Sequence, residues 1–222
     1  MDGNGRWAEQ RGLPRLSGHR VGLDNVRPVL EALTQGGVKY VSLYAFSTEN
    51  WNRPIEEVEG LMDILGESIK RETEALHEQG VRVLHLGRLD RLSPRLKQAI
   101  IQAQDLTRYN EVVTLSVAFD YGGRAEIVQA LKRMLKDGIS PDELDEGCVS
   151  RYLYTSMLPD PDLIIRTGGE LRLSNFFLWQ AAYSEYYPTS TLWPDFGPGE
   201  VAKALEDYSS RQRRFGNIFT GA

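Results

Sequence analysis

Apolar positions along this chain follow two spacings that alternate from one end to the other. Helical spacing predicts helices at 18–35, 55–80, 93–106, 122–138 and 199–213. Short apolar runs typical of buried strands lie at 38–45, 81–86, 112–119 and 162–165. This alternation predicts an α/β fold, with a parallel sheet that helices cover on both faces. No linker or repeat is visible, so we expect a single domain over residues 1–222.

The composition narrows the class of protein. The chain has 26 Lys and Arg against 31 Asp and Glu, and this net charge of -5 argues against a nucleic-acid binder. Cys148 is the one cysteine, which excludes an intrachain disulfide and a cysteine zinc cluster. No signal peptide is visible, and the longest apolar stretch, 38–46, is too short to span a bilayer. We expect a cytoplasmic protein whose contact with the inner membrane face, if any, is peripheral.

Polar segments follow several of the predicted strands. Residues 46–54, 120–124 and 166–174 each occupy such a position. In open parallel sheets, ligands bind beyond the carboxyl ends of the strands. We therefore expect these segments to converge, together with the N-terminal residues 2–6.

The N-terminal segment Asp2-Gly3-Asn4-Gly5-Arg6 has the composition of an anion site. Its glycines allow backbone N–H groups to turn toward a diphosphate, and Asp2 could hold Mg²⁺ against phosphate oxygens. The alternative is a frayed N-terminal turn. A dinucleotide fingerprint is also met formally, but that motif needs a preceding strand, and the sequence begins one residue before Asp2.

Arginines form a second candidate constellation. Arg6, Arg15, Arg53, Arg166 and Arg172 lie in or beside turn-rich segments, and the guanidinium fork suits phosphate. Scattered arginines are more often surface residues. Arg166 and Arg172 differ because they flank two glycines and a threonine and precede a serine, which predicts a second anion site.

Three further features have both a chemical and a structural interpretation. Segment 46–54 leaves a predicted strand and opens a helix, so it either faces the cleft or is a capping turn in which Trp51 simply packs. Glu185 lies among aromatic residues, where a carboxylate is costly unless it is paired or bound to metal. His19 could donate to a phosphate, although a lone histidine is more often structural.

Taken together, these motifs resemble the signature blocks of the cis-prenyltransferases, and bacterial undecaprenyl diphosphate synthase most of all. The blocks are MDGNGRWA at 1–8, Gly18-His19, YAFSTENW at 44–51, RTGGE at 166–170, RLSNF at 172–176 and LWPDF at 192–196. They run in family order to about residue 216. The resemblance implies a homodimer, a hydrophobic tunnel for the growing chain, and Mg²⁺ as cofactor. It also implies that the segment 213–216 reaches across the dimer.

The resemblance assigns a role to each site residue. Asp2 would be the catalytic aspartate that handles Mg²⁺, with help from Glu185. The allylic diphosphate would be bound by Gly3, Asn4, Gly5, Arg6, Arg15, His19 and Arg53. The substrate site would be lined by Trp7, Ser47, Thr48, Glu49 and Trp51. Isopentenyl diphosphate would be held by Arg166, Arg172, Leu173 and Ser174.

The implied reaction ionises an allylic diphosphate and joins its carbon chain to isopentenyl diphosphate. Negative charge grows on the leaving diphosphate, so fixed arginines and Mg²⁺ stabilise the transition state more than the ground state. The family role of Asn50 is proton acceptor, but a neutral amide is a poor base, and Asn50 could instead orient a diphosphate oxygen. The helix at 55–76 and the strands at 38–45 and 112–118 are the expected tunnel wall.

The sequence departs from the family pattern in three places. Members usually carry a strand before the MDGNGR block, and we expect its absence to destabilise the fold and leave Asp2 poorly fixed. Asp120 stands where bacterial members often have Asn, and Asn217 where a second glycine is common. Product length and primer, farnesyl or geranyl diphosphate, stay open, with undecaprenyl diphosphate as the default.

The sequence gives less support to three other functions. An all-helical trans-prenyltransferase needs Asp-rich motifs, and the chain contains no adjacent Asp pair. A nucleotide-binding α/β protein is a second rival, and a non-catalytic relative acting as a binding subunit is a third. Non-catalytic relatives typically lose the aspartate or the arginines, which this chain keeps.

Overall fold

The computed structural model of the chain describes residues 1–211, so the predicted block at 213–216 and Asn217 lie outside the described residues. Five strands are present there: β1 (Tyr40–Ser47), β2 (Val81–Leu86), β3 (Val113–Tyr121), β4 (Leu163–Arg166) and β5 (Glu185–Pro188). The helices are α1 (Asn4–Glu9), α2 (Arg15–Asp24), α3 (Val26–Gln35), α4 (Ile55–Glu78), α5 (Pro94–Thr107), α6 (Gly123–Asp137), α7 (Glu146–Tyr152) and α8 (Pro198–Ser210).

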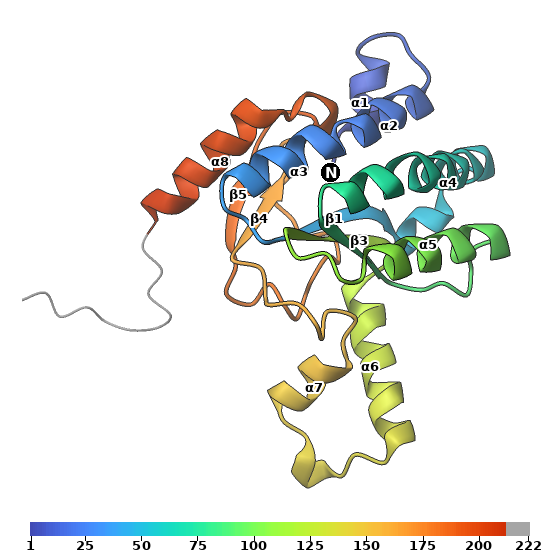
Figure 1. Ribbon diagram of the computed structural model, residues 1–222, viewed down its shortest axis with the longest axis vertical. Helices are drawn as coiled ribbons and strands as arrows, with labels where there is room; N and C mark the ends of the chain where they lie inside the picture. The colour runs from blue at the N-terminus through green and yellow to red at the C-terminus, as the bar shows by residue number, and fades with distance from the viewer. Residues whose placement is uncertain (212–222) are drawn as a thin grey trace, which may run out of the picture.

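All strand pairs are parallel, as predicted, and they form two sheets. One sheet has the order β1-β3-β2 and the other pairs β4 with β5. Helices flank the strands, and α6 and α7 extend away from the sheets as a separate projection (Figure 1). The predicted α/β class with a helix-flanked parallel sheet is thus confirmed.

The main core lies under α3 and α8. Val29, Leu30 and Leu33 of α3 pack with alternate residues of β1 and β3 and with Trp193 and Phe196. A strand places every second side chain on the same face, so Val41 and Leu43 reach this core together. A second cluster forms where α4 and α5 pack against the end of the sheet, around Phe46 and Phe119.

The first long helix predicted from the sequence is two helices. The prediction at 18–35 is wrong at Asn25, where α2 ends and α3 begins, and α2 starts earlier, at Arg15. The Asn25 side chain donates hydrogen bonds to the carbonyls of Trp193 and Phe196, 2.7 and 3.0 Å away. Pro28 lies in the first turn of α3, where a missing N–H costs little. The apolar spacing continues through the break and conceals it.

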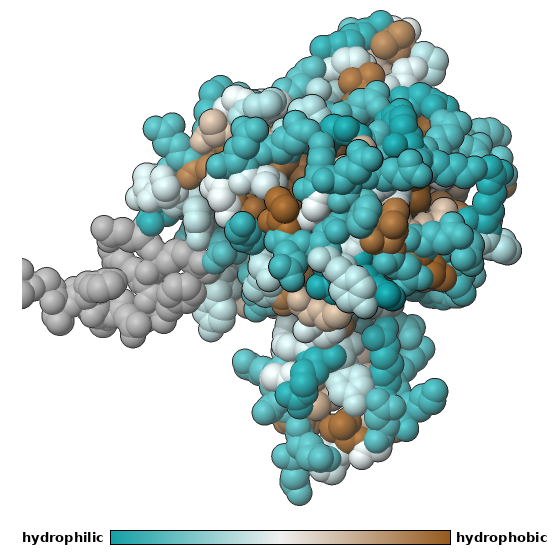
Figure 2. Space-filling view, in the orientation of Figure 1, coloured by the Kyte–Doolittle hydropathy of each residue, from teal (hydrophilic) through white to brown (hydrophobic). Residues whose placement is uncertain are grey.

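The surface on the face shown in Figure 2 is largely hydrophilic, with hydrophobic residues in separate spots. Among the described helices, none combines the length and the apolar character that a membrane span requires.

Candidate functional site

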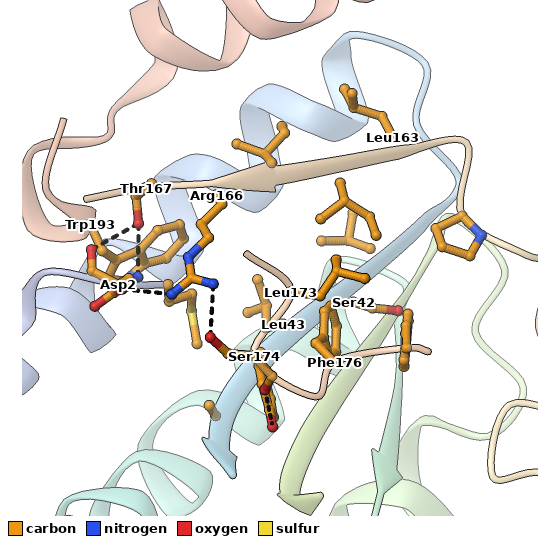
Figure 3. Close-up of a pocket in the computed structure, with 18 of the residues that line it drawn as sticks. Asp2, Ser42, Leu43, Leu163, Arg166, Thr167, Leu173, Ser174, Phe176 and Trp193 are labelled. Carbon is orange, nitrogen blue, oxygen red and sulfur yellow. Dashed lines mark hydrogen bonds and ion pairs between the residues drawn. The ribbon is translucent and has the colours of Figure 1, made fainter. Parts of the chain in front are cut away.

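A cavity of about 830 Å³ lies between β1 and β4. One end is polar and is lined by the N-terminal segment 2–6, the start of α2, and the segments that follow β1 and β4. The other end is apolar, with side chains such as Leu43 of β1 and Leu163 of β4 (Figure 3). The predicted convergence of segments 2–6, 46–54 and 166–174 is therefore found; Asp120–Arg124 does not line this cavity.

Asp2 stands at the polar end and is fixed by its backbone. Its N–H donates to the Thr167 hydroxyl and its carbonyl accepts from the same hydroxyl, each at 2.8 Å. The Trp193 N–H donates to the same carbonyl at 3.0 Å. The expectation that Asp2 is poorly fixed is therefore wrong for this structure, because Thr167 and Trp193 hold it from two other segments.

The Asp2 carboxylate is surrounded by donors. Arg166 donates to Oδ2 at 3.1 Å, the Gly3 N–H donates to Oδ1 at 2.7 Å, and Arg6 lies 3.7 Å from Oδ1. Burial acts to raise the pKa of Asp2, but Arg166, Gly3 and Arg6 outweigh it and hold the pKa below its usual value. Asp2 is therefore ionised at neutral pH and keeps an exposed side, with 41% of its side chain accessible.

Arg166 ties the second predicted anion site together. Besides Asp2, its guanidinium donates to the Ser174 hydroxyl at 2.9 Å and to the Arg172 carbonyl. Arg172 itself is exposed and pairs with Glu170 at 2.5 Å. Ser174 has a positive φ of 50°, and the next residue, Asn175, has one of 66°. The turn that presents the Ser174 hydroxyl therefore has a sparsely populated backbone conformation.

The glycine pair after Arg166 does not present free amides. Gly168 and Gly169 both have positive φ, 85° and 78°. Their N–H groups donate to the carbonyls of Thr191 and Thr189, at 2.9 and 2.8 Å. The glycines therefore shape the turn, and the charged donors at this site are the arginine side chains. A side chain at Gly168 would also collide with Arg6, 2.4 Å from the position of a Cβ.

The remaining side chains predicted to bind the allylic diphosphate gather around Glu57 of α4. Arg53 donates to Glu57 at 3.0 Å, Arg15 lies 3.5 Å from it and the His19 ring 3.8 Å. Arg15 also packs onto Gly5, where a Cβ would lie 2.7 Å from its guanidinium. One mostly buried carboxylate thus holds Arg15, His19 and Arg53 on the same wall of the cavity.

His19 is neutral at physiological pH. Burial, with the nearby charge of Arg53, lowers the pKa of His19 to about 4. Its Nε2 is buried and has no hydrogen-bond partner among the described residues. A neutral imidazole can donate one N–H, so His19 can contact an anion at the cavity without carrying charge.

The segment after β1 forms a short 3-10 helix, Thr48–Asn52, with a reciprocal cap. The Asn50 side-chain oxygen accepts from the Ser47 N–H at 3.1 Å. Ser47, Asn50 and Arg53 line the cavity. Both interpretations of the segment are therefore correct, because the capping turn also presents these groups to the cleft.

Several predicted site residues do not line the cavity. Thr48 and Glu49 bond to each other, and Glu49 accepts from Asn175 at 2.7 Å. Trp7 donates from its indole to Asp195 at 2.7 Å. Trp51 turns toward Asp120.

Glu185 is also apart from Asp2 in this chain. It begins β5 opposite Leu163, three register positions from the pair Arg166 and Pro188, and it pairs with Arg211 at 2.9 Å. The metal role of Glu185 stays a prediction.

The donor set at Asp2 fits a magnesium ion that a substrate shares. Mg²⁺ typically binds one or two carboxylates plus phosphate oxygens and waters. Asp2 is an ionised and accessible carboxylate beside Arg6 and Arg166. Within residues 1–211, no group of three acidic, histidine or cysteine side chains could hold a metal alone. The chain therefore supplies at most part of a metal shell here.

The apolar part of the cavity agrees only partly with the expected tunnel wall. β1 lines it along its whole length, but α4 contributes only Leu61 and packs mainly against α5. β3 does not line it. The opposite wall comes from β4, β5 and the segment 158–162, which the sequence did not suggest. Thr167 was also not assigned a role from sequence, although its place between Arg166 and two glycines marks it as part of the turn.

Comparisons with known proteins agree on one family. The family model described as undecaprenyl diphosphate synthase matches residues 1–216. An isoprenyl transferase of Heliobacterium mobile is 50% identical over 222 residues, covering 98% of this chain and 85% of the relative. A ditrans,polycis-undecaprenyl-diphosphate synthase ((2E,6E)-farnesyl-diphosphate specific) of Legionella pneumophila is 46% identical and covers 98% and 93%. The crystal structure of lavandulyl diphosphate synthase from Lavandula x intermedia, in complex with dimethylallyl diphosphate, superposes with a TM-score of 0.94 at 36% identity, covering 98% of this chain and 95% of the other.

Proposed function

Because this chain belongs to the undecaprenyl diphosphate synthase family of cis-prenyltransferases, we propose that it extends an allylic diphosphate with isopentenyl diphosphate in the cavity between β1 and β4. The observation that supports this most strongly is the polar end of that cavity. An ionised Asp2 lies there between Arg6 and Arg166, with the Arg15, His19 and Arg53 wall beside it.

The allylic diphosphate lies at segment 3–6 and the Arg15 and Arg53 wall. Asn4, Gly5 and Arg6 form the first turn of α1, and N–H groups in a first turn have no intrahelical acceptor. Fixed donors and cations stabilise the charge that develops on the leaving diphosphate more than the charge of the ground state. His19 adds a neutral donor.

Isopentenyl diphosphate lies against Arg166, Arg172 and Ser174. Arg166 contacts both Asp2 and Ser174, so the two diphosphates are held on either side of one guanidinium. Holding two reactants side by side converts a bimolecular step into an effectively unimolecular one. The new carbon–carbon bond forms as the allylic C–O bond breaks, and a proton then leaves the isopentenyl carbon.

Asp2 would hold a Mg²⁺ ion together with phosphate oxygens. When bound, that ion neutralises charge on the diphosphate that departs. Arg166 and Gly3 keep the carboxylate oriented and ionised. Asn50 has its side-chain oxygen occupied by the Ser47 N–H, which favours orientation of a diphosphate oxygen over direct proton abstraction by Asn50.

The product is a long polyprenyl diphosphate made from farnesyl diphosphate. Undecaprenyl diphosphate, a lipid carrier for cell-wall sugars, is the default product. The apolar part of the cavity receives the growing chain, since each buried CH₂ contributes about 0.8 kcal/mol. The protein works as a cytoplasmic homodimer that meets the inner membrane face only peripherally, to release its product. The Legionella relative, with its farnesyl-diphosphate specificity, supports this choice of primer.

The test is a product assay with purified protein. Farnesyl diphosphate, labelled isopentenyl diphosphate and Mg²⁺ are incubated with the wild type and with Asp2→Ala, and products are sized by chromatography. We expect elongated product that disappears in the variant and in chelator. If folded wild-type protein elongates neither farnesyl nor geranyl diphosphate, the catalytic proposal is wrong, and a binding subunit becomes the better interpretation.

A further inference from the structure

Asp120 is a buried carboxylate at the end of β3. Only 1% of the residue is exposed, and its φ of 49° lies in the left-handed region. Asp and Asn tolerate that region better than other side chains with a Cβ. A buried carboxylate is costly unless it is paired and hydrogen-bonded, so its partners indicate what it does.

Two side chains from distant segments satisfy Asp120. The Trp51 indole N–H donates to Oδ1 at 2.8 Å. Arg91, between β2 and α5, donates its Nε–H to Oδ2 at 2.9 Å and a second N–H to Oδ1. The Arg91 guanidinium also lies over the Trp51 ring, 5.0 Å from its centroid. The three side chains therefore form one closed cluster.

This cluster joins segment 47–53 to the end of β3. Trp51 packs edge-on against Phe46, with ring centroids 5.3 Å apart, and does not line the cavity. Its neighbours Asn50 and Arg53 do. The 3-10 helix that carries Asn50 and ends just before Arg53 has only five residues, and such a short element has little stability of its own. Trp51 anchors this element to the end of β3.

We infer that Asp120 is a positioning residue: through Trp51 it holds Asn50 and Arg53 at the cavity, and Arg91 supplies the charge that allows a buried carboxylate to do so. Hydrogen bonds to an ionised acceptor are about twice as strong as neutral ones. A carboxylate in place of an amide therefore gives a stiffer anchor. What Asn50 and Arg53 bind rests on the proposed function, but the anchoring itself does not.

The experiment compares Trp51→Phe and Asp120→Asn with the wild type. Trp51→Phe keeps an aromatic ring against Phe46 and removes the N–H donor together with the second ring of the indole. Asp120→Asn keeps an acceptor and a residue type that tolerates the backbone angle. The matched control is Asp90→Asn, which breaks the exposed pair with Arg88 on the same loop as Arg91. Measurements are thermal stability, the affinity for inorganic pyrophosphate, and kcat and KM for both substrates.

We expect Trp51→Phe to weaken pyrophosphate binding and lower kcat/KM by about tenfold each, since misplaced binding groups cost that much or more. Asp120→Asn should lose about threefold, in line with the weaker neutral hydrogen bond. For the position of the segment, the double variant should be no worse than Trp51→Phe alone, because both changes act on the same Trp51–Asp120 hydrogen bond. Asp90→Asn should match the wild type.

Wild-type pyrophosphate affinity and kcat/KM in a folded Trp51→Phe would overturn the inference. So would losses that simply add in the double variant. If the wild type fails to elongate any primer, the proposed function fails, and the pyrophosphate affinities still decide whether Asp120 positions the segment.

Discussion

The Thr167 hydroxyl is bonded to Asp2 twice: it accepts the Asp2 N–H and donates to the Asp2 carbonyl, each at 2.8 Å. Thr167 is 2% exposed, so water cannot replace either bond. The residue that follows β4 thereby fixes the N-terminal segment beside Arg166. The position of the Asp2 carboxylate is in this way set by a residue 165 positions away.

Replacing Thr167 with Val should remove both bonds at nearly constant volume. The Asp2 carbonyl keeps the Trp193 N–H, but the Asp2 N–H loses its acceptor, which costs about 1–3 kcal/mol. A small displacement of Asp2 should lower kcat about tenfold to a hundredfold. Thr167→Ser keeps the hydroxyl and should retain most activity. Steady-state kinetics and thermal unfolding of both variants check this. Equal activity in Thr167→Val and Thr167→Ser would show that Asp2 is fixed by other contacts.

Arg166→Lys tests whether one guanidinium joins the two halves of the site. Lysine is a point charge on a flexible stem and cannot reproduce the fork to Asp2 and Ser174. We expect kcat/KM for isopentenyl diphosphate to fall about tenfold to a hundredfold. Arg88→Lys, at an exposed pair with Asp90, is the control and should have no effect.

The same Arg166→Lys variant has a signature in its pH dependence. Arg166 is the main group that opposes burial and lowers the pKa of Asp2, so its replacement should raise that pKa. The acidic limb of the kcat/KM profile should therefore move to higher pH. An unchanged acidic limb with reduced activity would mean that Arg166 binds substrate without affecting the ionisation of Asp2.

The sequence predicts which segments meet, because the segments that follow parallel strands share one edge of a sheet. That reasoning predicts that segments 46–54, 120–124 and 166–174 meet, with residues 2–6 beside them. The structure agrees except for 120–124, which does not line the cavity. The sequence could not predict that the Gly168 and Gly169 amides are already bonded to the segment after β5. The short strand β5 ends in Pro188 and carries no clear alternation that would reveal it.

Polar contacts between residues far apart in the chain could also not be predicted from the sequence. Trp51 and Asp120 are 69 positions apart, and neither spacing nor composition links them. Of the two interpretations of Trp51, packing agrees better with the structure than lining the site, because Trp51 contacts Phe46 and Asp120 and does not line the cavity. The division at Asn25 was missed for a similar reason, because its bonds go to Trp193 and Phe196.

His19 should make stability depend on pH in a defined window. Its pKa is about 4 in the folded chain against 6.5 in the unfolded chain, so the unfolded state binds the proton first. The contribution is complete above pH 6.5 and is lost as pH falls toward 4. From the linkage relation, about 2 kcal/mol is lost by pH 5. His19→Gln should lose that much less than the wild type between pH 7.5 and pH 5 in urea unfolding. Parallel losses would show that His19 is not responsible.

In the part of the chain that the structure describes, the strands β1 and β4 each leave one edge unpaired beside the cavity. In the described residues β1 pairs only with β3, and β4 only with β5. The outer edge of β2 is covered differently, since its Val83 and His85 N–H groups donate to Thr107 and Gln104 of α5. Unpaired strand edges that face one another can accept a further strand.

Met1 lies at the end of this space, and its terminal amine is buried, which lowers the pKa of the amine to about 6. A lowered pKa means that the charged amine is disfavoured there, so the burial costs stability below pH 8. Joining Met1 to a preceding residue would remove that charge. An extended segment in this place would also bond to β1 and β4 and fill the slot with apolar side chains.

We therefore predict that about six added residues of alternating Val and Ile before Met1 stabilise the protein, six being intermediate between the lengths of β1 and β4. Each added 1 kcal/mol should raise Tm by about 2–4 °C. The control is an extension of equal length with two prolines. Proline has no N–H to donate to a strand edge, so this extension should pair poorly with β1 and β4. A higher Tm with the first extension alone, measured at pH 7 and with activity kept, means that the slot belongs to a strand and that the prenyl chain lies elsewhere. A higher Tm with loss of activity means that the added strand and the growing chain compete for the same space.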